Sequence, residues 1–346
     1  MARTTQPVLE REPTTEYHPA VHRRAPGRST PPSPLRGVVI PSEGERMEVR
    51  AGDRVVCLTN LGKPFWPELG ITKGALLQYY ADVASVLLPH LIDRAMVMKR
   101  YPHGAQGEFF YMKRAPSPRP RWIETCSIAH RSGNVIDFPL VQDLASLLWV
   151  VNLGCIDLNP WYARCDDVDR PDFLHFDLDP GPGAGFEKVR EAALRVRDAL
   201  GSLGIPSYPK TSGSKGIHVY VPIVRNPAQK QVWAFAKGLA VSLAQQHPEL
   251  LTAEYRIARR PHGRVLVDYN QNAWGRTLAS VYSVRPTPRA TVSTPVTWEE
   301  VEAGIAIEDF HLGNVRERVR ERGDLWKPLL DRSGRVDLEA LLWSSR

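Results

Sequence analysis

The chain has 346 residues, 42% of them hydrophobic, and its 45 Lys and Arg residues outnumber 38 Asp and Glu residues to give a formal net charge of +7. This length suits one large domain or two ordinary ones, and the basic balance favours a polyanionic partner. No run of about 18 apolar residues occurs and the N-terminus lacks an apolar core, so neither a membrane span nor a signal peptide is expected.

The cysteines do not form a C-x-x-C pair, so neither a zinc ribbon nor a disulfide framework is expected. A reducing, cytoplasmic compartment fits this cysteine usage. The four residues concerned are Cys57, Cys126, Cys155 and Cys165.

The N-terminal segment, residues 1–46, is rich in Pro, Arg, Glu, Ser and Thr and has no apolar period. This composition predicts a disordered, basic tail. Residues 47–346 are predicted to fold as one domain. Helical spacing of apolar residues predicts helices over 72–92, 141–155, 186–204 and 227–247, and further helices beyond Thr297.

Strands are predicted where short apolar or alternating runs end at Gly, Pro or Asn. These runs cover 95–104, 107–115, 172–180, 207–213, 216–223, 264–270 and 279–285. Because strands and helices alternate irregularly, we expect an α/β or α+β fold with mixed sheets flanked by helices.

The run HFDLDPGPG, residues 175–183, places two carboxylates on one strand. Strand alternation puts Asp177 and Asp179 on the face opposite Leu174, Phe176 and Leu178. At roughly 6.6 Å the two charges would repel by about 2.5 kcal/mol at an effective dielectric near 20. A divalent cation between them would remove this repulsion. The alternative, in which Asp179 caps the following turn and Asp177 is solvated, has equal weight for the pair alone.

A second motif, TSGSKGIHVYVPI, joins a small-residue loop to a strand. Gly213 and Gly216 would allow a ligand to approach the backbone, while Ser212, Lys215 and His218 offer a hydroxyl, a charge and an imidazole. The loop is therefore a candidate triphosphate site, although its spacing is not that of a P-loop. Taken alone, a Gly/Ser hairpin turn is the stronger interpretation.

A third motif, VLVDYNQN, contains Asp268 after a short apolar run. A single aspartate there is more often a strand-end residue than a ligand. Three such carboxylates beside a Ser-Gly-rich loop form a rarer combination, and oxygen ligands suit two Mg²⁺ or Mn²⁺ ions rather than zinc. Two ions about 3.5–4 Å apart would activate a 3′-hydroxyl and stabilise a leaving pyrophosphate.

These three motifs resemble those of the primase–polymerase domain of bacterial ligase D, within the archaeo-eukaryotic primase superfamily. The resemblance runs from about Leu58 to the C-terminal helices and includes TKGALLQYYADVASVLLPHL, KRYPHGAQGEFFYMKRAP and YSVRP. It implies a primase-like catalytic core with mixed sheets flanked by helices.

The resemblance also implies roles for residues of the core. Asp177 and Asp179 would bind both metals, and Asp268 would bind the catalytic metal next to the primer 3′-hydroxyl. The incoming nucleotide would be bound by Ser212, Lys215, His218 and Arg285, with Gln271 near the sugar.

Further residues are implied in DNA binding. Phe109 and Phe110 would stack against the templating base, although core packing of one ring is the stronger interpretation of the pair alone. Lys99 and Arg100 would follow the template strand. Lys63 and Lys73 would hold the 5′-phosphate beyond a gap; ordinary surface charge is the alternative. Many relatives have a His where this chain has Asn159, so 5′-phosphate binding is expected to be weaker or differently built.

The implied activity is template-directed addition of ribo- or deoxyribonucleotides to a primer 3′-hydroxyl. It would fill short gaps in end joining or excision repair, in the cytoplasm at the nucleoid. Because no K-x-D-G motif or nuclease domain is found, a separate ATP-dependent DNA ligase, and possibly Ku, would act in trans. A metal-dependent nuclease and a non-catalytic DNA-end binding module are the alternatives. The triphosphate loop argues against the first and the intact aspartates argue against the second.

Overall fold

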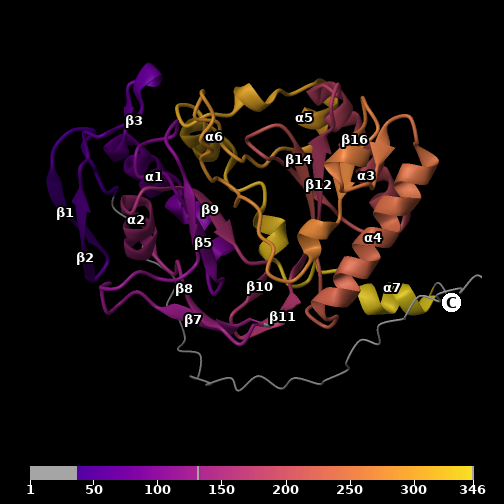
Figure 1. Cartoon of the computed structure of the whole chain (residues 1–346), viewed down its shortest axis with the longest axis horizontal. Coiled ribbons are helices and arrows are strands. Elements are labelled where there is room, and N and C mark those ends of the chain that lie inside the picture. Colours follow the sequence, from indigo (N-terminus) through magenta and orange to yellow (C-terminus); the bar gives the residue numbers. More distant parts are fainter. Residues whose placement is uncertain (1–36, 131, 345–346) are drawn as a thin grey trace, which may run out of the picture.

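The N-terminal half of the fold consists of short antiparallel strands around two buried helices (Figure 1). The computed structural model describes residues 37–130 and 132–344. Strands pair in the orders β1-β2, β3-β4, β6-β5-β9, β7-β8 and β10-β11. Their bounds are β1 Arg46–Ala51, β2 Arg54–Thr59, β3 Pro64–Trp66, β4 Ile71–Thr72, β5 Met96–Arg100, β6 Phe110–Met112, β7 Thr125–Ala129, β8 Val135–Pro139, β9 Cys155–Pro160, β10 Ala163–Arg164 and β11 Asp167–Pro171.

The two helices of this half are α1 (Lys73–Leu91) and α2 (Leu144–Asn152), and both confirm predicted helices. The Thr72 hydroxyl caps α1 by accepting a hydrogen bond from the backbone N–H of Ala75. Within α1, the Tyr79 and Tyr80 hydroxyls donate to backbone carbonyls of residues 282 and 156. Helix α1 therefore ties β9 to the C-terminal part of the chain.

The C-terminal half is built on one five-stranded sheet of order β13-β14-β12-β16-β15. All neighbours are antiparallel except β15 and β16, which confirms a mixed sheet. Helices α3 (Phe186–Ser202) and α4 (Gln229–Gln246) pack against β12 and against each other (Figure 1). The strands are β12 Phe173–Pro180, β13 Tyr208–Thr211, β14 Ile217–Pro222, β15 Leu251–Thr252 and β16 Val265–Asp268.

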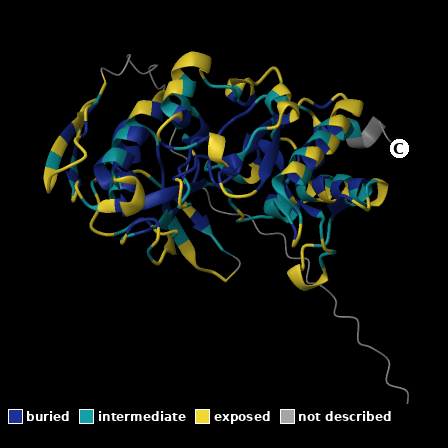
Figure 2. Ribbon diagram, turned by 90° about the horizontal axis from the view of Figure 1, so that it is seen from above, coloured by how far each residue is buried: buried dark blue, intermediate teal, exposed yellow. Residues whose placement is uncertain are grey.

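The two faces of β12 differ as the sequence predicts. Leu174, Phe176 and Leu178 are fully buried in the hydrophobic core. The alternate residues face the N-terminal half, where the ring of His175 lies 4.1 Å from that of Tyr162. Figure 2 shows that buried residues fill the interior of both halves while exposed residues follow the outer loops.

The segment 279–285, predicted as a strand, is not one. It contains a turn and an isolated bridge between Val284 and Val292. Tyr282 has φ +59°, a left-handed conformation that interrupts an extended strand. The helices predicted beyond Thr297 are present but short: α5 Trp298–Ala303, α6 Val315–Arg322 and α7 Leu338–Ser344.

The predicted tail extends too far along the chain. Ile40 is buried at 5% exposure, and its backbone N–H donates to Gln78 of α1. An apolar side chain that reaches the core thus places the folded region before residue 46, while residues 1–36 lie outside the described part. None of the helices found over the described residues is long and apolar enough to cross a membrane.

The cysteine spacing did not predict a disulfide framework, but the structure contains a disulfide. Cys126 on β7 and Cys165 form a disulfide with a Cα–Cα distance of 5.9 Å. Sequence spacing missed it because the two residues are 39 positions apart and meet only when the β7-β8 hairpin packs against the β10 segment. Cys57 and Cys155 are free thiols.

Candidate active site

A row of four ionisable side chains crosses the five-stranded sheet. Lys210 on β13 pairs with His218 on β14, His218 pairs with Asp177 on β12, and Asp177 pairs with Asp268 on β16. Directly opposed residues in antiparallel strands share a face, so the four side chains lie side by side. The fold therefore brings together two sequence motifs, the paired aspartates and VLVD, that lie about ninety residues apart in the chain.

The paired aspartates lie in a place that disfavours their charge. Burial raises the pKa of Asp177 to about 6, although Lys210 and Arg285 oppose the shift. Burial, followed by the charge of Asp177, raises the pKa of Asp179 to about 7. Burial and then Asp177 also raise the pKa of Asp268. The three carboxylates thus repel one another in a low-dielectric site.

The donor set fits a divalent cation. Among the described residues, none of the three carboxylates forms an ion pair with Lys or Arg. As they stand, however, the same residues contain no group of three or more His, Cys, Asp or Glu side chains placed so that it could hold a metal ion. Mutual repulsion with oxygen-only ligands is the situation that Mg²⁺ or Mn²⁺ relieves. Asp177, Asp179 and Asp268 are the residues that would hold such ions.

The loop between β13 and β14 is held against this row by its serine. The Ser212 hydroxyl oxygen accepts hydrogen bonds from the backbone N–H groups of residues 214, 215 and 216 at 3.1, 3.2 and 2.9 Å. Lys215 is exposed, and its charge lowers the pKa of both Asp177 and Asp179. The loop therefore presents the exposed ammonium of Lys215 beside the carboxylates.

Glycine is required twice in this loop. Gly213 has φ +67°, and a Cβ there would lie 2.8 Å from the backbone N of Ser293. A Cβ at Gly216 would lie 2.3 Å from the carbonyl oxygen of Leu178 on β12. The close approach of the loop to β12 thus depends on both glycines.

Two of the nucleotide-binding residues implied by the resemblance, His218 and Gln271, contact different carboxylates of the row. His218 is buried, with Nε2 3.2 Å from an oxygen of Asp177. At the other end, the Gln271 amide donates to Asp268 at 3.2 Å, and the backbone N–H of Asn270 donates to the other oxygen at 2.8 Å. Both contacts orient carboxylates of the row.

Arg285 reaches the loop from the irregular segment after residue 279. Its guanidinium donates to the backbone carbonyl of Ser212, and its Nε lies 3.3 Å from Asp157. Lys99 lies 3.8 Å from the other oxygen of Asp157. Asp157 on β9 is 2% exposed and links the two cations across the two halves. Sequence reasoning missed it, although a lone acidic residue in the apolar run CIDL was a usable signal.

The aromatic pair lies on β6 and the residue before it. Phe109 and Phe110 are 49% and 43% exposed, so core packing, the alternative interpretation, does not describe either ring. Lys99 lies over the Phe109 ring at 4.1 Å, and Arg100 lies over the Phe110 ring at 5.2 Å. Each ring is thus accompanied by a cation from β5.

Lys63, Lys73 and Arg100 form one basic group. Burial, then Lys63, then Arg100 lower the pKa of Lys73 to about 8. The Lys73 ammonium donates to the backbone carbonyl of Thr59 at 2.7 Å. The alternative interpretation was ordinary surface charge, but this environment is not that of an ordinary surface lysine.

Asn159 does not join that group. On β9 it pairs with Val97 and lies on the face of Asp157 and Lys99, whereas Arg100 points to the other face. Its amide donates to the backbone carbonyl of Asp157 at 3.0 Å. Strand alternation thus places Asn159 on the face opposite Arg100, and its role in DNA binding stays a prediction.

Two further basic residues near the row were not predicted. Arg260 lowers the pKa of Asp177, Asp179 and Asp268, so its charge lies close to all three. Lys210 is fully buried at one end of the row. A lysine in a short strand and an arginine in a basic loop both look like surface residues in the sequence.

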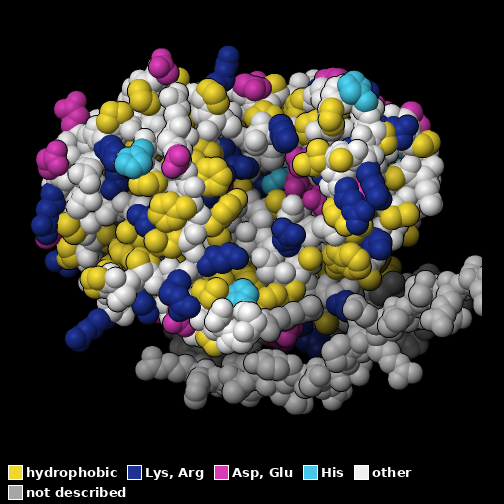
Figure 3. All heavy atoms as spheres, viewed as in Figure 1, with side chains coloured by type: hydrophobic (Ala, Val, Ile, Leu, Met, Phe, Trp, Pro, Cys, Tyr) yellow, Lys and Arg dark blue, Asp and Glu magenta, His cyan; other side chains and the backbone are white. Residues whose placement is uncertain are grey.

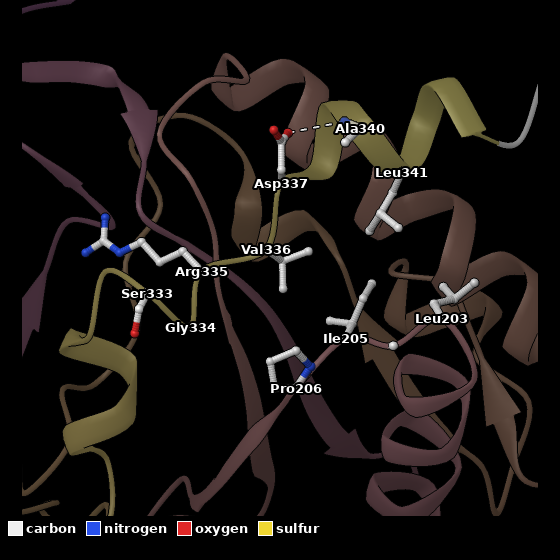
Figure 4. Close-up of a pocket in the computed structure, with 11 residues that line it drawn as sticks. Leu203, Ile205, Pro206, Ser333, Gly334, Arg335, Val336, Asp337, Ala340 and Leu341 are labelled. Carbon is white, nitrogen blue, oxygen red and sulfur yellow. Dashed lines mark hydrogen bonds between the residues drawn. The ribbon is translucent and has the colours of Figure 1, made fainter.

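Figure 3 shows acidic, His and basic side chains gathered near the middle of one face, between the two halves. A cavity of about 370 Å³ lies elsewhere (Figure 4). It is lined by residues 203–206 after α3 and by residues 333–341 around the start of α7. The row of Lys210, His218, Asp177 and Asp268, together with the neighbouring Asp179, is therefore a separate site, which we call the carboxylate row.

Comparison with known proteins extends over most of the chain. Residues 72–326 match the family model of the LigD primase-polymerase domain. The multifunctional non-homologous end joining protein LigD of Mycolicibacterium smegmatis is 35% identical over 79% of this chain, and the bifunctional LigD of Bacillus subtilis is 31% identical over 77%. The chain spans 36% and 42% of the length of these two relatives.

A solved structure shows the same fold. The polymerase domain from Mycobacterium tuberculosis ligase D in complex with DNA matches with a TM-score of 0.75 at 32% sequence identity. The match covers 81% of this chain and 99% of that one. The carboxylate row, the adjoining loop and these matches together show that the chain belongs to the LigD primase-polymerase domain family.

Proposed function

We propose that the protein is a template-directed nucleotidyltransferase that adds ribo- or deoxyribonucleotides to a primer 3′-hydroxyl and fills short gaps in broken DNA. The observation that carries this proposal is the juxtaposition of three carboxylates, which form no ion pair with Lys or Arg among the described residues, with a loop that presents Lys215. Carboxylates alone would suit phosphodiester hydrolysis equally well. A triphosphate site beside them is needed only for nucleotide addition.

Two Mn²⁺ or Mg²⁺ ions fit the carboxylate row, where they would neutralise developing charge and lower the pKa of the attacking hydroxyl. Asp177 and Asp179 would hold both ions and Asp268 one of them. Gln271 and the backbone N–H of Asn270 keep Asp268 oriented toward the row. These contacts fix the carboxylate before any ligand arrives.

The incoming nucleotide would be bound by side chains on both sides of the loop. Lys215 is exposed and provides a point charge. The Ser212 hydroxyl oxygen only accepts, from three backbone N–H groups, so its own hydrogen would be donated to the phosphate. His218 and Arg285 border the same space. Gln271, beside Asp268, would lie near the sugar. Charged donors to phosphate contribute about 1.5–3 kcal/mol each.

DNA would bind along the cations and aromatic rings of the N-terminal half. Phe109 and Phe110 would stack on the templating base, since both rings are exposed and base stacking contributes about 1–3 kcal/mol. Lys99 and Arg100 would contact the template backbone. Lys63 and Lys73 would bind the 5′-phosphate at the far side of a gap.

The curated relatives are named for non-homologous end joining. We extend that process to this chain, with a separate ATP-dependent ligase sealing the filled gap and Ku holding the ends. The same chemistry would serve gap filling in excision repair. A Ku-dependent increase in extension across a two-ended break, but not across a gap in one duplex, would separate the two processes.

The test is extension of a one-nucleotide gap with each of the four nucleotides opposite each templating base. The expected result is addition of the complementary nucleotide, measured with ribo- and deoxyribonucleotides under Mg²⁺ and Mn²⁺. Shortening of the labelled primer without addition would instead support the nuclease. Unchanged primer in the presence of tight DNA binding would support a non-catalytic binding module.

A further inference from the structure

A lysine lies fully buried at the outer end of the carboxylate row. Lys210 on β13 is 0% exposed and stands directly opposite His218. Lysines are rarely buried this far unless they are paired with an acid. In the described residues, however, its ammonium is hydrogen-bonded to no carboxylate; it contacts Nδ1 of His218 at 2.8 Å and the hydroxyl of Ser293.

The direction of these hydrogen bonds follows from the number of available hydrogens. The Ser293 hydroxyl uses its one hydrogen to donate to the backbone carbonyl of Thr211 at 3.0 Å. Its oxygen therefore accepts from Lys210. The amine retains at least one further hydrogen whether it is charged or neutral. A charged Lys210 can only donate, so Nδ1 of His218 accepts from it at 2.8 Å; a neutral Lys210 can donate to Nδ1 as well, but its nitrogen could instead accept from an Nδ1 hydrogen.

The second nitrogen of His218 completes the assignment. With Nδ1 accepting from Lys210, the single hydrogen of a neutral imidazole is on Nε2. Nε2 lies 3.2 Å from an oxygen of Asp177, which is an acceptor. The opposite tautomer would direct a nitrogen lone pair at the Asp177 carboxylate and, where Lys210 is charged, leave the Nδ1 hydrogen facing an ammonium that can only donate. Both contacts therefore select the same tautomer.

We propose that Lys210 is a positioning residue, which holds His218 as an Nε2–H donor aimed into the space beside Asp177. The identity of the acceptor, a phosphate oxygen of the incoming nucleotide, rests on the proposed function. The tautomer of His218 and its dependence on Lys210 do not rest on the proposed function. The arrangement parallels metal-bound histidines, whose second nitrogen is fixed by an outer partner and whose binding weakens about 10–100-fold when that partner is lost.

The first measurement concerns the imidazole itself. Nitrogen-15 NMR of the histidine-labelled protein, without nucleotide or DNA, reports which ring nitrogen carries the hydrogen, and the spectrum of His218→Gln identifies the resonances of His218. We expect the Nε2–H tautomer. An Nδ1–H ring would overturn the proposal. Because the tautomer is read from the wild-type protein and the variant serves only to assign the resonances, this result does not depend on polymerase activity.

The second measurement is a double-mutant cycle on nucleotide affinity, measured with a fluorescent ribonucleoside triphosphate and Mg²⁺. Lys210→Met should weaken binding at least tenfold in the wild-type background and less than twofold in the His218→Ala background. Lys237→Met, at an exposed position on α4, is the matched control and should leave affinity unchanged.

Equal loss from Lys210→Met in both backgrounds would show that Lys210 acts on the fold rather than through His218. Full affinity in a folded Lys210→Met protein would overturn the proposal in the same way. Absence of primer extension by the wild-type protein, together with the expected tautomer and cycle, would reject the proposed function and leave the positioning role intact.

Discussion

At the scale of single residues, burial makes the paired aspartates destabilising when they are charged. Burial raises the pKa of Asp177 to about 6 and that of Asp179 to about 7, from 3.8. Between about pH 4 and pH 7 the folded protein therefore holds more protons at these groups than the unfolded chain. Their contribution to the free energy of unfolding falls as the pH rises through this interval.

A metal ion should reverse this loss. We predict that the increase in melting temperature caused by Mn²⁺ is larger at pH 7.5 than at pH 5.5, because protons compete with the ion at low pH. Differential scanning calorimetry at fixed ionic strength measures it. The Asp177→Asn/Asp179→Asn double variant should lose both the metal effect and its pH dependence. An equal increase at both pH values for the wild type would contradict the metal assignment.

Lys73 predicts a second pH dependence, in DNA binding. Its pKa is lowered to about 8, so it is mostly charged at pH 7 and mostly neutral at pH 9. The preference for a gapped duplex with a 5′-phosphate over one with a 5′-hydroxyl should therefore weaken roughly tenfold over this interval. Binding to the two duplexes at constant salt measures the preference. Lys73→Met should show a smaller preference for the 5′-phosphate, and this preference should not change with pH. If the preference of the wild-type protein stays constant between pH 7 and pH 9, Lys73 is excluded from the site.

Residue roles were predictable from the sequence only where a motif carries them. Asp177, Asp179 and Asp268 were found as motif residues, and the fold does bring Asp177 and Asp268 together. Lys210 was missed because only cross-strand pairing reveals that a strand lysine is buried. That Asn159 lies on the face of Lys99 was not predictable, because its face depends on the register of β9 against β5.

At the scale of elements, the β13-β14 loop is rigid because its backbone contacts β12 and its serine binds its own N–H groups. We predict that Gly216→Ala lowers the free energy of unfolding by about 1–3 kcal/mol and weakens nucleotide binding, since its Cβ would lie 2.3 Å from the Leu178 carbonyl oxygen. Chemical denaturation and nucleotide titration measure the two effects.

The matched control is Gly201→Ala in α3, where an added Cβ meets no atom within 4 Å. This variant should be neutral or more stable by about 0.5–1 kcal/mol, because alanine favours the helix. If Gly216→Ala behaves like Gly201→Ala, the loop does not depend on its approach to β12.

Helices and strands with a clear period of apolar residues were predicted well, whereas irregular segments were not. The helix at 72–92 and the strand at 172–180 are present as α1 and β12. The strand expected at 279–285 is absent, since the left-handed Tyr282 is set by the hydrogen bond between its hydroxyl and Asp324 and by the packing of the surrounding chain. Composition cannot indicate such a tertiary effect.

At the scale of the whole molecule, a buried ion pair joins the end of α1 to the start of β12. Arg94 is 1% exposed and donates to both oxygens of Asp172 at 2.7 and 2.8 Å. Asp172 also accepts from Arg164 of β10 at 3.0 Å. This group connects the N-terminal half to the sheet that holds the carboxylate row, so it holds the two sides of the site together.

We predict that Arg94→Met lowers the free energy of unfolding by about 3–5 kcal/mol, because it leaves the Asp172 carboxylate buried without its main partner. Asp166→Asn removes an exposed pair with Arg225 of similar two-bond geometry and should cost less than about 1 kcal/mol. Urea denaturation, monitored by circular dichroism, compares the stability of the two variants. Equal losses would mean that the buried pair does not join the halves.

The central claim is that the carboxylate row transfers nucleotides to a primer. The most direct measurement is single-turnover extension of a one-nucleotide gap by wild type and Asp268→Asn, with nucleotide affinity measured on the same preparations. The account predicts addition of the complementary nucleotide by wild type and at least a hundredfold slower addition by Asp268→Asn, with nucleotide affinity within a few-fold, since Lys215 and His218 are untouched. Addition by a folded Asp268→Asn at the wild-type rate would contradict it.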